Sequence, residues 1–409
     1  MAQLLLLLPQ LPQDPASGAA RSMRTAVEML AAAGWQIRVL AVTASESAIP
    51  IAAADFLRGS GVKVSIQAPN LTVYRHDRPV LEFTDSHGIF YRLLDTGNQP
   101  ALRWHLEHST QFNRLYQREL AEHRPEIVFG YGGFDADLER YRRARAAGCK
   151  VIFGLRNHGY KTARWLAELD GVLTCSRYLT EVYREALGLE STPLPSPLDL
   201  ADVLAREREP IFFTVINPSI EKGVFFLARL AEELSLRRPD IPMLFIESRG
   251  SAGMLVQAGQ AGGFDLRRHE NLMFAPAVSK PAEIFRGTRV LLVPSVWPEP
   301  FGRVAAEALL NGVPPIVSDR GGLAEAANGG GFVLPLPASL TLETRTPVVA
   351  ADVAPWLELI EQLADDDAFY AESSARAKSA GDFYLPDTLA SRYVEYFERI
   401  RCGGGGSHR

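Results

Sequence analysis

Two glutamates, Glu299 and Glu307, are separated by seven residues in a segment that runs from the end of an apolar strand into a helix. At a rise of 1.5 Å per residue, this spacing places them about 12 Å apart along the helix axis. That span is comparable with the distance from a sugar ring, across a diphosphate, to a ribose. The backbone N–H groups of Phe301, Gly302 and Arg303 lie between them, at a helix start that can hold phosphate oxygens. The alternative is structural: Glu299 complements the helix dipole and Glu307 is a surface residue.

A second candidate segment, residues 215–223, follows the first expected strand of the second half of the chain. Its Lys222 would open the helix expected over residues 224–237. A cation at the start of a helix opposes the helix dipole. We therefore expect an anion between Lys222 and the helix, in preference to a solvated lysine in a turn.

Short apolar runs alternate with amphipathic stretches, which predicts an α/β protein with parallel, doubly wound sheets and helices on both faces. The expected strands are residues 4–8, 37–42, 127–129, 151–155, 172–175, 211–216, 243–247, 272–274, 290–293 and 315–317. The expected helices are residues 20–33, 138–147, 224–237, 281–287, 301–311 and 322–327, and residues 355–401 are expected to be helices only. Residues 60–110 suggest only strands and loops inserted in the first domain.

The alternation stops at a proline-rich connection, residues 193–197, and then restarts. This predicts two similar Rossmann-like domains, residues 1–198 and residues 199–380. A helix over residues 381–402 is expected to pack back on the first domain, and residues 403–409 look like an appended linker. Ligands bind doubly wound sheets outside the carboxyl ends of their strands. The loops that follow the strands are therefore where the chemistry is expected.

At the level of motifs, the sequence resembles the retaining nucleotide-sugar glycosyltransferases with the GT-B fold, of the large family four type. The motifs that carry this resemblance are Ser17-Gly18, Asp170–Ser176, Pro195–Asp199, Glu221-Lys222-Gly223, the Glu-x7-Glu block with Gly312-Val313-Pro314 after it, and Ser318–Glu325. The resemblance implies two Rossmann-like domains that face each other across a cleft. The first domain would bind the acceptor and the second the nucleotide-sugar donor.

The resemblance also implies roles by position. Lys222 would neutralise the donor diphosphate, Glu299 would contact the transferred sugar near the reacting carbon, and Glu307 would bind the ribose hydroxyls. His158, at the end of a strand, is similar to the active-site histidine of the family, and the alternative is a polar loop or helix-capping histidine. The residues whose backbone would approach the sugar or phosphates are Gly18, Phe301, Gly302 and Val304.

One position departs from the family pattern. The family usually has Gly-Arg before the lysine, whereas this chain reads Ile216-Asn217, an Asn-Pro variant of the phosphate loop. Arg303 and Arg249 are therefore the candidates for a second cation at the diphosphate, with surface arginines as the alternative. Asn217 can still donate neutral hydrogen bonds.

These features predict transfer of a sugar from a UDP- or GDP-type donor, with retention, to a hydroxyl acceptor such as a glycan, a lipid or a small molecule. Because Lys222 and the helix start would carry the leaving-group charge, no metal and no covalently bound cofactor is expected. The alternatives are a nucleotide-sugar epimerase, a sugar phosphorylase, and a non-catalytic sugar- or nucleotide-binding protein. Candidate acceptor-side residues are Arg156, Tyr160, Tyr131, His87 and Asp95.

The composition limits the classes of binding partner and the cellular location that we expect. The net charge is −5, without the basic excess of nucleic-acid-binding proteins. Three cysteines in no zinc or disulfide pattern suggest reduced thiols and a cytoplasmic location. No basic amphipathic helix indicates a lipid surface, and a peripheral membrane contact stays open. Two acidic clusters, residues 135–137 and 365–367, resemble metal motifs but are expected to be structural, with Asp135 a weak acceptor-side candidate.

Overall fold

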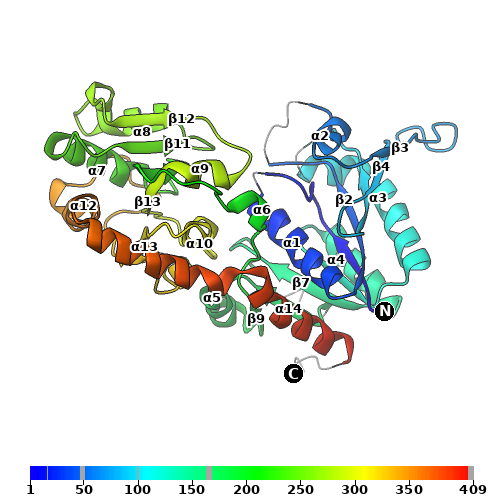
Figure 1. Ribbon diagram of the computed structural model, residues 1–409. Coiled ribbons are helices and arrows are strands. Elements are labelled where there is room, and N and C mark those ends of the chain that lie inside the picture. The colour runs from blue at the N-terminus through cyan, green and yellow to red at the C-terminus, as the bar shows by residue number, and fades with distance from the viewer. Residues whose placement is uncertain (16, 47–50, 98, 100, 163–167, 404–409) are drawn as a thin grey trace. The chain divides into compact units, whose positions relative to one another are not determined.

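The computed structural model describes residues 1–403 apart from residues 16, 47–50, 98, 100 and 163–167. The chain divides into two units (Figure 1). The first unit consists of Met1–Pro197 and Pro386–Arg409, and the second unit consists of Leu198–Leu385. Among the described residues, no helix is both long enough and apolar enough to cross a membrane.

The first unit is built on a nine-stranded sheet with the order β3-β4-β5-β2-β1-β6-β7-β8-β9. The strands from β5 to β9 are parallel, and β3 and β4 form an antiparallel edge. Their bounds are β1 Gln3–Leu7, β2 Gln36–Val42, β3 Ser65–Gln67, β4 Val80–Thr84, β5 Phe90–Leu94, β6 Ile127–Gly130, β7 Lys150–Leu155, β8 Gly171–Thr174 and β9 Thr192–Pro193. The carboxyl ends of its parallel strands therefore meet at one edge.

Helices cover both faces of this sheet, which explains the unbroken leucine run of β1. Leu4 and Leu6 pack in a core cluster with residues of α1 and α14, while Leu5 and Leu7 are also buried but lie outside that cluster. Because side chains alternate across a strand, both faces must be shielded from water. The helices are α1 Gly18–Ala32, α2 Ala53–Gly59, α3 Ala101–His123, α4 Asp135–Ala146, α5 Arg177–Leu187 and α14 Pro386–Arg401.

The second unit has a six-stranded parallel sheet with the order β12-β11-β10-β13-β14-β15. Its strands are β10 Phe212–Ile216, β11 Met243–Ile246, β12 Leu272–Ala275, β13 Thr288–Val293, β14 Pro315–Ser318 and β15 Phe332–Leu334. Its helices are α6 Leu200–Val203, α7 Val224–Arg237, α8 Ala252–Ala261, η2 Leu266–Arg268, α9 Pro281–Gly287, α10 Arg303–Leu310, α11 Leu323–Ala327, α12 Ala350–Asp365, α13 Asp367–Gly381 and η3 Asp382–Tyr384. In order along the chain this is the 3-2-1-4-5-6 arrangement of a Rossmann-like domain.

All ten expected strands are present, with ends that differ by one or two residues. The expected helix over residues 301–311 begins at Arg303, because Gly302 adopts a left-handed φ of 105° at the position before it. Helix α12 begins at Ala350, five residues before Pro355, so that the proline lies within the helix. Residues 60–110 contain β3, β4, β5 and the start of the long helix α3, none of which was assigned from the sequence.

Candidate functional site

The order of the strands brings two of the predicted segments together in the second unit. β10 and β13 are hydrogen-bonded neighbours in the sheet. In the sequence, 71 residues lie between Ile216, the last residue of β10, and Thr288, the first residue of β13. The strand order reverses between them, so this pair forms the switch point at which doubly wound sheets bind ligands. The loop with Lys222 follows β10, and the loop with Glu299 follows β13.

The loop after β10 is a tight turn that leads into α7. Asn217 adopts a left-handed φ of 62°, and its Oδ1 accepts a hydrogen bond from the Gly250 N–H at 2.5 Å. Gly223 precedes α7 with a φ of 83°. A Cβ on Gly223 would lie 2.2 Å from the carbonyl oxygen of Pro294, so only glycine allows the two loops to come this close.

Backbone hydrogen bonds join the loop after β10 to the loop after β13. The carbonyl of Glu221 accepts from the amides of Val296 at 2.9 Å and Trp297 at 3.0 Å. In turn, the carbonyl of Glu299 accepts from the Gly322 amide at 2.7 Å. The loops after β10, β13 and β14 are therefore held together by main-chain contacts, which fix the backbone at Glu299.

Lys222 and Glu299 form an ion pair between Nζ and Oε1. The hydroxyl of Ser295 donates a second hydrogen bond to the same carboxylate oxygen at 2.9 Å. The side chain of Glu299 is 14% exposed and that of Lys222 27% exposed. The structure thus places the predicted phosphate-binding cation and the predicted sugar-binding carboxylate in direct contact.

A cavity of about 590 Å³ opens beside this ion pair. It is lined by Asn217, Ser219, Ile220, Glu221, Lys222, Arg249, Met254, Trp297 and Glu299. Four residues predicted from the sequence, Asn217, Lys222, Arg249 and Glu299, therefore share one cavity. Arg249, one of the two arginines predicted as a second cation, is the arginine in this lining.

The other lining residues were not singled out from the sequence. Glu221 and Trp297 lie inside the two segments that drew attention, so their position was the available signal. Met254 comes from α8 and had no local signal. The pKa of Glu221 is held below its usual range by its own backbone N–H and by the hydroxyl of Ser219, so this carboxylate adds a negative charge to the lining.

The remaining donor-side candidates lie at the start of α10, outside this lining. Glu307 is in the second turn of the helix, as expected, but it is buried and its Oε1 accepts a hydrogen bond from Arg303 Nε at 2.7 Å. The surface alternative for Glu307 is therefore wrong. The ring of Phe301 packs against Tyr384, so this residue can offer the cavity only its backbone. Val304 lies in the first turn of α10, the part of a helix where backbone N–H groups can face a ligand.

In the first unit, His158 lies in the loop that follows β7, at the carboxyl edge of the sheet. Its ring contacts the ring of Tyr178 edge-on, with centroids 5.8 Å apart. Tyr183 on α5 fixes the loop, because its hydroxyl donates to the Asn157 carbonyl at 2.8 Å and accepts from the Tyr160 amide at 3.1 Å. His158 is thus held at an edge where ligands bind such sheets.

The helix expected over residues 20–33 begins two residues earlier, so Gly18, which was expected in the loop before it, is instead the first residue of α1. The Ser17 hydroxyl caps this helix by accepting a hydrogen bond from the Ala20 amide at 3.4 Å. One residue of each acidic cluster makes a structural contact. Asp137 is buried, accepts from the Phe134 amide at 3.1 Å and pairs with Arg140, while Asp366 caps α13.

The proposed acceptor-side residues divide between two edges of the first sheet. Asp95 follows β5, Tyr131 follows β6, and Arg156 follows β7, all at the carboxyl edge. Tyr160 belongs to the same loop as His158. His87 lies instead in the turn between β4 and β5, beside the amino end of β5, because β4 runs antiparallel to the rest of the sheet.

Residues 197–379 match the model of the family described as Glycosyl transferases group 1. This match covers nearly the whole second unit, including the loops that follow β10 and β13. These residues therefore form a glycosyltransferase group 1 domain.

Two curated relatives resemble the chain in sequence. "Uncharacterized glycosyltransferase YqgM" of Bacillus subtilis is 24% identical over 260 residues, which cover 59% of this chain and 66% of that protein. "D-inositol 3-phosphate glycosyltransferase" of Rhodococcus erythropolis is 26% identical over 182 residues, which cover 42% of this chain and 37% of that protein. The chain thus spans less than two thirds of the length of either relative.

A solved structure extends the likeness to both units. The crystal structure of Anabaena Alr3699/HepE in complex with UDP has a TM-score of 0.64 and 15% sequence identity, and the match covers 97% of this chain and 100% of that one. The expected α/β class, with parallel sheets in two domains as in GT-B glycosyltransferases, is confirmed by this likeness.

Proposed function

We propose that this chain, whose second unit is a glycosyltransferase group 1 domain, transfers a sugar from a nucleoside diphosphate sugar to a hydroxyl acceptor with retention at the anomeric carbon. The observation that carries the proposal is the ion pair of Lys222 and Glu299 in a cavity at the switch point of the second sheet. A UDP- or GDP-type donor fits a site whose fold neighbour is a complex with UDP.

Departure of the nucleoside diphosphate requires that its growing negative charge be stabilised. Lys222 would stabilise this charge, and Arg249, which lines the same cavity, would be the second cation. The amides of Gly302 and Val304 at the start of α10 add neutral donors. Because these groups supply positive charge and hydrogen bonds, we propose that transfer needs no metal ion. Activity would then be unchanged after exhaustive treatment with a chelator.

Glu299 would contact the transferred sugar, with Lys222 beside its carboxylate. Glu307 would bind the ribose hydroxyls, either after its carboxylate turns away from Arg303 or while the carboxylate keeps its ion pair with Arg303. The first unit would supply the acceptor side through His158 and the loop that Tyr183 fixes. A glycan, a lipid or a small molecule can present the acceptor hydroxyl.

Radiolabelled UDP-sugars and GDP-sugars, supplied with and without a panel of hydroxyl acceptors, test the proposal. We expect release of the nucleoside diphosphate together with a labelled product that keeps the anomeric configuration of the donor. Release of sugar phosphate from a glycan by inorganic phosphate would indicate a phosphorylase, and interconversion of two nucleotide sugars an epimerase. Saturable binding of the donor without turnover would indicate a binding protein.

Glu307 and Glu299 are expected to separate binding from turnover. Glu307→Ala should weaken binding of the nucleoside diphosphate by about tenfold to a hundredfold, since hydrogen bonds to a charged group contribute about 1.5–3 kcal/mol. Glu299→Ala should mainly lower kcat. Calorimetric titration and steady-state kinetics measure the two effects.

The matched control is Glu233→Ala, which removes another Arg–Glu pair at i,i+4 spacing, on α7 of the same unit. It should leave nucleotide affinity and kcat at the values of the parent protein. Equal nucleotide affinity in the Glu307 variant and the parent would contradict the ribose role.

A further inference from the structure

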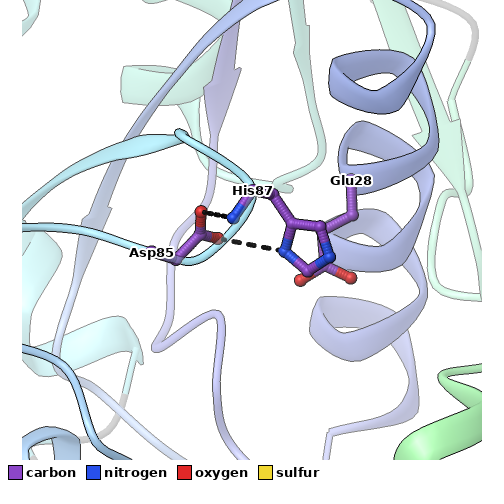
Figure 2. A group of neighbouring side chains, drawn as sticks. All are labelled: Glu28, Asp85 and His87. Atoms are coloured by element: carbon purple, nitrogen blue, oxygen red, sulfur yellow. Dashed lines mark hydrogen bonds and ion pairs between the residues drawn. The ribbon is translucent and has the colours of Figure 1, made fainter.

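Three side chains of the first unit converge on one point (Figure 2). Glu28 comes from α1, and Asp85 and His87 come from the turn between β4 and β5. Their ligand atoms, one from each side chain, all lie within 4.8 Å of one another. Among the residues that the structure describes, this is the one group of three histidine, cysteine or acidic side chains that come this close.

The turn holds two of these side chains in place. Asp85 Oδ1 accepts hydrogen bonds from the amides of His87 at 2.9 Å and Ile89 at 3.0 Å, which leaves Oδ2 facing the imidazole. Asp85 Oδ2 and His87 Nδ1 are 3.8 Å apart. Two ligands on one tetrahedral ion with bonds of about 2.1 Å are about 3.4 Å apart. The exposed ring of His87 therefore needs only a small rotation to share an ion with Asp85.

A buried phenol points to the same place. Tyr91 is fully buried, and its hydroxyl has no hydrogen bond of good geometry to any described residue. The hydroxyl lies near the carboxylates of Asp85 and Glu28, to which a phenol can donate a hydrogen bond. Metal-binding carboxylates commonly accept a hydrogen bond from such an outer neighbour, which orients them toward the ion.

The side chains of the cluster carry more negative than positive charge, which favours binding of a cation. Asp85 and Glu28 have side chains that are each 14% exposed, and Arg24 pairs with Glu28 at 3.1 Å. Arg24 thus offsets one carboxylate, and the second faces the imidazole of His87 and the phenol of Tyr91. A divalent ion would add the missing positive charge, while the exposed edge at His87 leaves a coordination position for water.

We propose that Glu28, Asp85 and His87 bind one divalent zinc ion. One imidazole nitrogen and two carboxylate oxygens are a ligand set that zinc accepts, with water as the fourth ligand. Magnesium and calcium prefer sets made of oxygen ligands and would gain little from the imidazole.

The place of the cluster in the fold defines its role. The turn joins β4 to the amino end of β5, where Phe90 pairs with Arg38 near the start of β2. His158 follows β7 at the opposite, carboxyl edge of the same sheet. The ion would therefore link the antiparallel edge of the sheet to α1 and take no part in sugar transfer. The zinc site can thus be tested independently of the proposed function.

Calorimetric titration of the metal-free chain, residues 1–409, with zinc chloride tests the site. We expect one equivalent to bind, a higher thermal unfolding midpoint with zinc, and no binding of magnesium under the same conditions. His87→Ala and Asp85→Asn should each weaken zinc binding at least tenfold and abolish the shift in the midpoint. Asparagine keeps an Oδ1 that can accept the same two amide hydrogen bonds, so Asp85→Asn is expected to preserve the turn.

Two control variants test whether zinc binds instead to a histidine or a thiol elsewhere on the chain. His76→Ala removes an exposed histidine of the same unit, and Cys402→Ser removes the exposed thiol. Both should bind zinc as tightly as the parent. The site would be refuted by the absence of a saturable equivalent, by unchanged affinity in the His87 and Asp85 variants, or by loss of binding in a control variant alone.

Discussion

Lys222→Ala is expected to lower kcat/KM for sugar transfer by about a hundredfold to a thousandfold, the usual loss when one donor to a developing anion is removed. Lys222 contacts Glu299 at the edge of the cavity that would hold the diphosphate. Its removal would both deprive the leaving group of a cation and leave the carboxylate of Glu299 without its counter-ion. That unbalanced charge would repel the phosphates, so nucleotide affinity should fall together with turnover.

Lys280→Ala is the matched control. Lys280 belongs to the same unit and lies 3.7 Å from Asp202, outside the cavity beside Glu299. Its removal should change kcat/KM by less than about twofold, because exposed ion pairs contribute little. Steady-state rates of nucleoside diphosphate release measure both variants. Activity of the Lys222 variant within a few-fold of the parent would contradict the phosphate role.

Gly223→Ala is expected to destabilise the protein by about 3–4 kcal/mol. A left-handed backbone costs an alanine about 1 kcal/mol, and forcing a methyl group into a packed space adds about 2–3 kcal/mol. At Gly223 the new Cβ would be 2.2 Å from the Pro294 carbonyl oxygen. The loops that carry Lys222 and Glu299 would have to separate, so nucleotide binding should also be lost.

The chain contains a close control for this substitution. Gly263 has the same φ of 83°, and a Cβ there would meet no atom within 4 Å. Gly263→Ala therefore reports the backbone cost alone, about 1 kcal/mol. Urea unfolding of the two variants and the parent gives the difference. Equal destabilisation by the two substitutions would show that the loops can separate without cost.

The parallel parts of both sheets could be predicted because burial on two faces leaves a plain record in the sequence. The leucine run of β1 and the apolar runs of β10 and β13 are of this kind. Glycine and proline at their ends then mark the loops. Such signals depend only on neighbours along the chain, and they suffice for strands that are buried on both faces.

The elements of residues 60–110 were not assigned from the sequence, because charged side chains are buried in this region and interrupt the apolar pattern. Arg92 occupies the middle of β5 and is 3% exposed, and Glu119 on the inner face of α3 is 1% exposed. Glu119 pairs with Arg92 and, at 3.1 Å, with Arg38. A buried ion pair between distant elements hides the apolar periodicity of each. The fold compensates these charges through contacts that no local pattern reveals.

The candidate site, too, was predictable where the signal lies along the chain and unpredictable where it depends on side-chain contacts. Lys222 and Glu299 were predicted because each follows a strand, and the pairing of β10 with β13 places the two loops side by side. The side-chain contacts of the site were not assigned from the sequence: Met254 enters the lining from α8, Ser295 donates to Glu299, and Glu307 accepts from Arg303 within α10.

A crystal structure of the chain with bound UDP, and in parallel with GDP, tests the central claim most directly. We expect the diphosphate to lie against Lys222 and the start of α10, with the ribose hydroxyls within hydrogen-bonding distance of Glu307. Density for either nucleotide at another surface, or an empty cavity beside Glu299 at concentrations that saturate calorimetric binding, would contradict the assignment of this unit as the donor-binding domain.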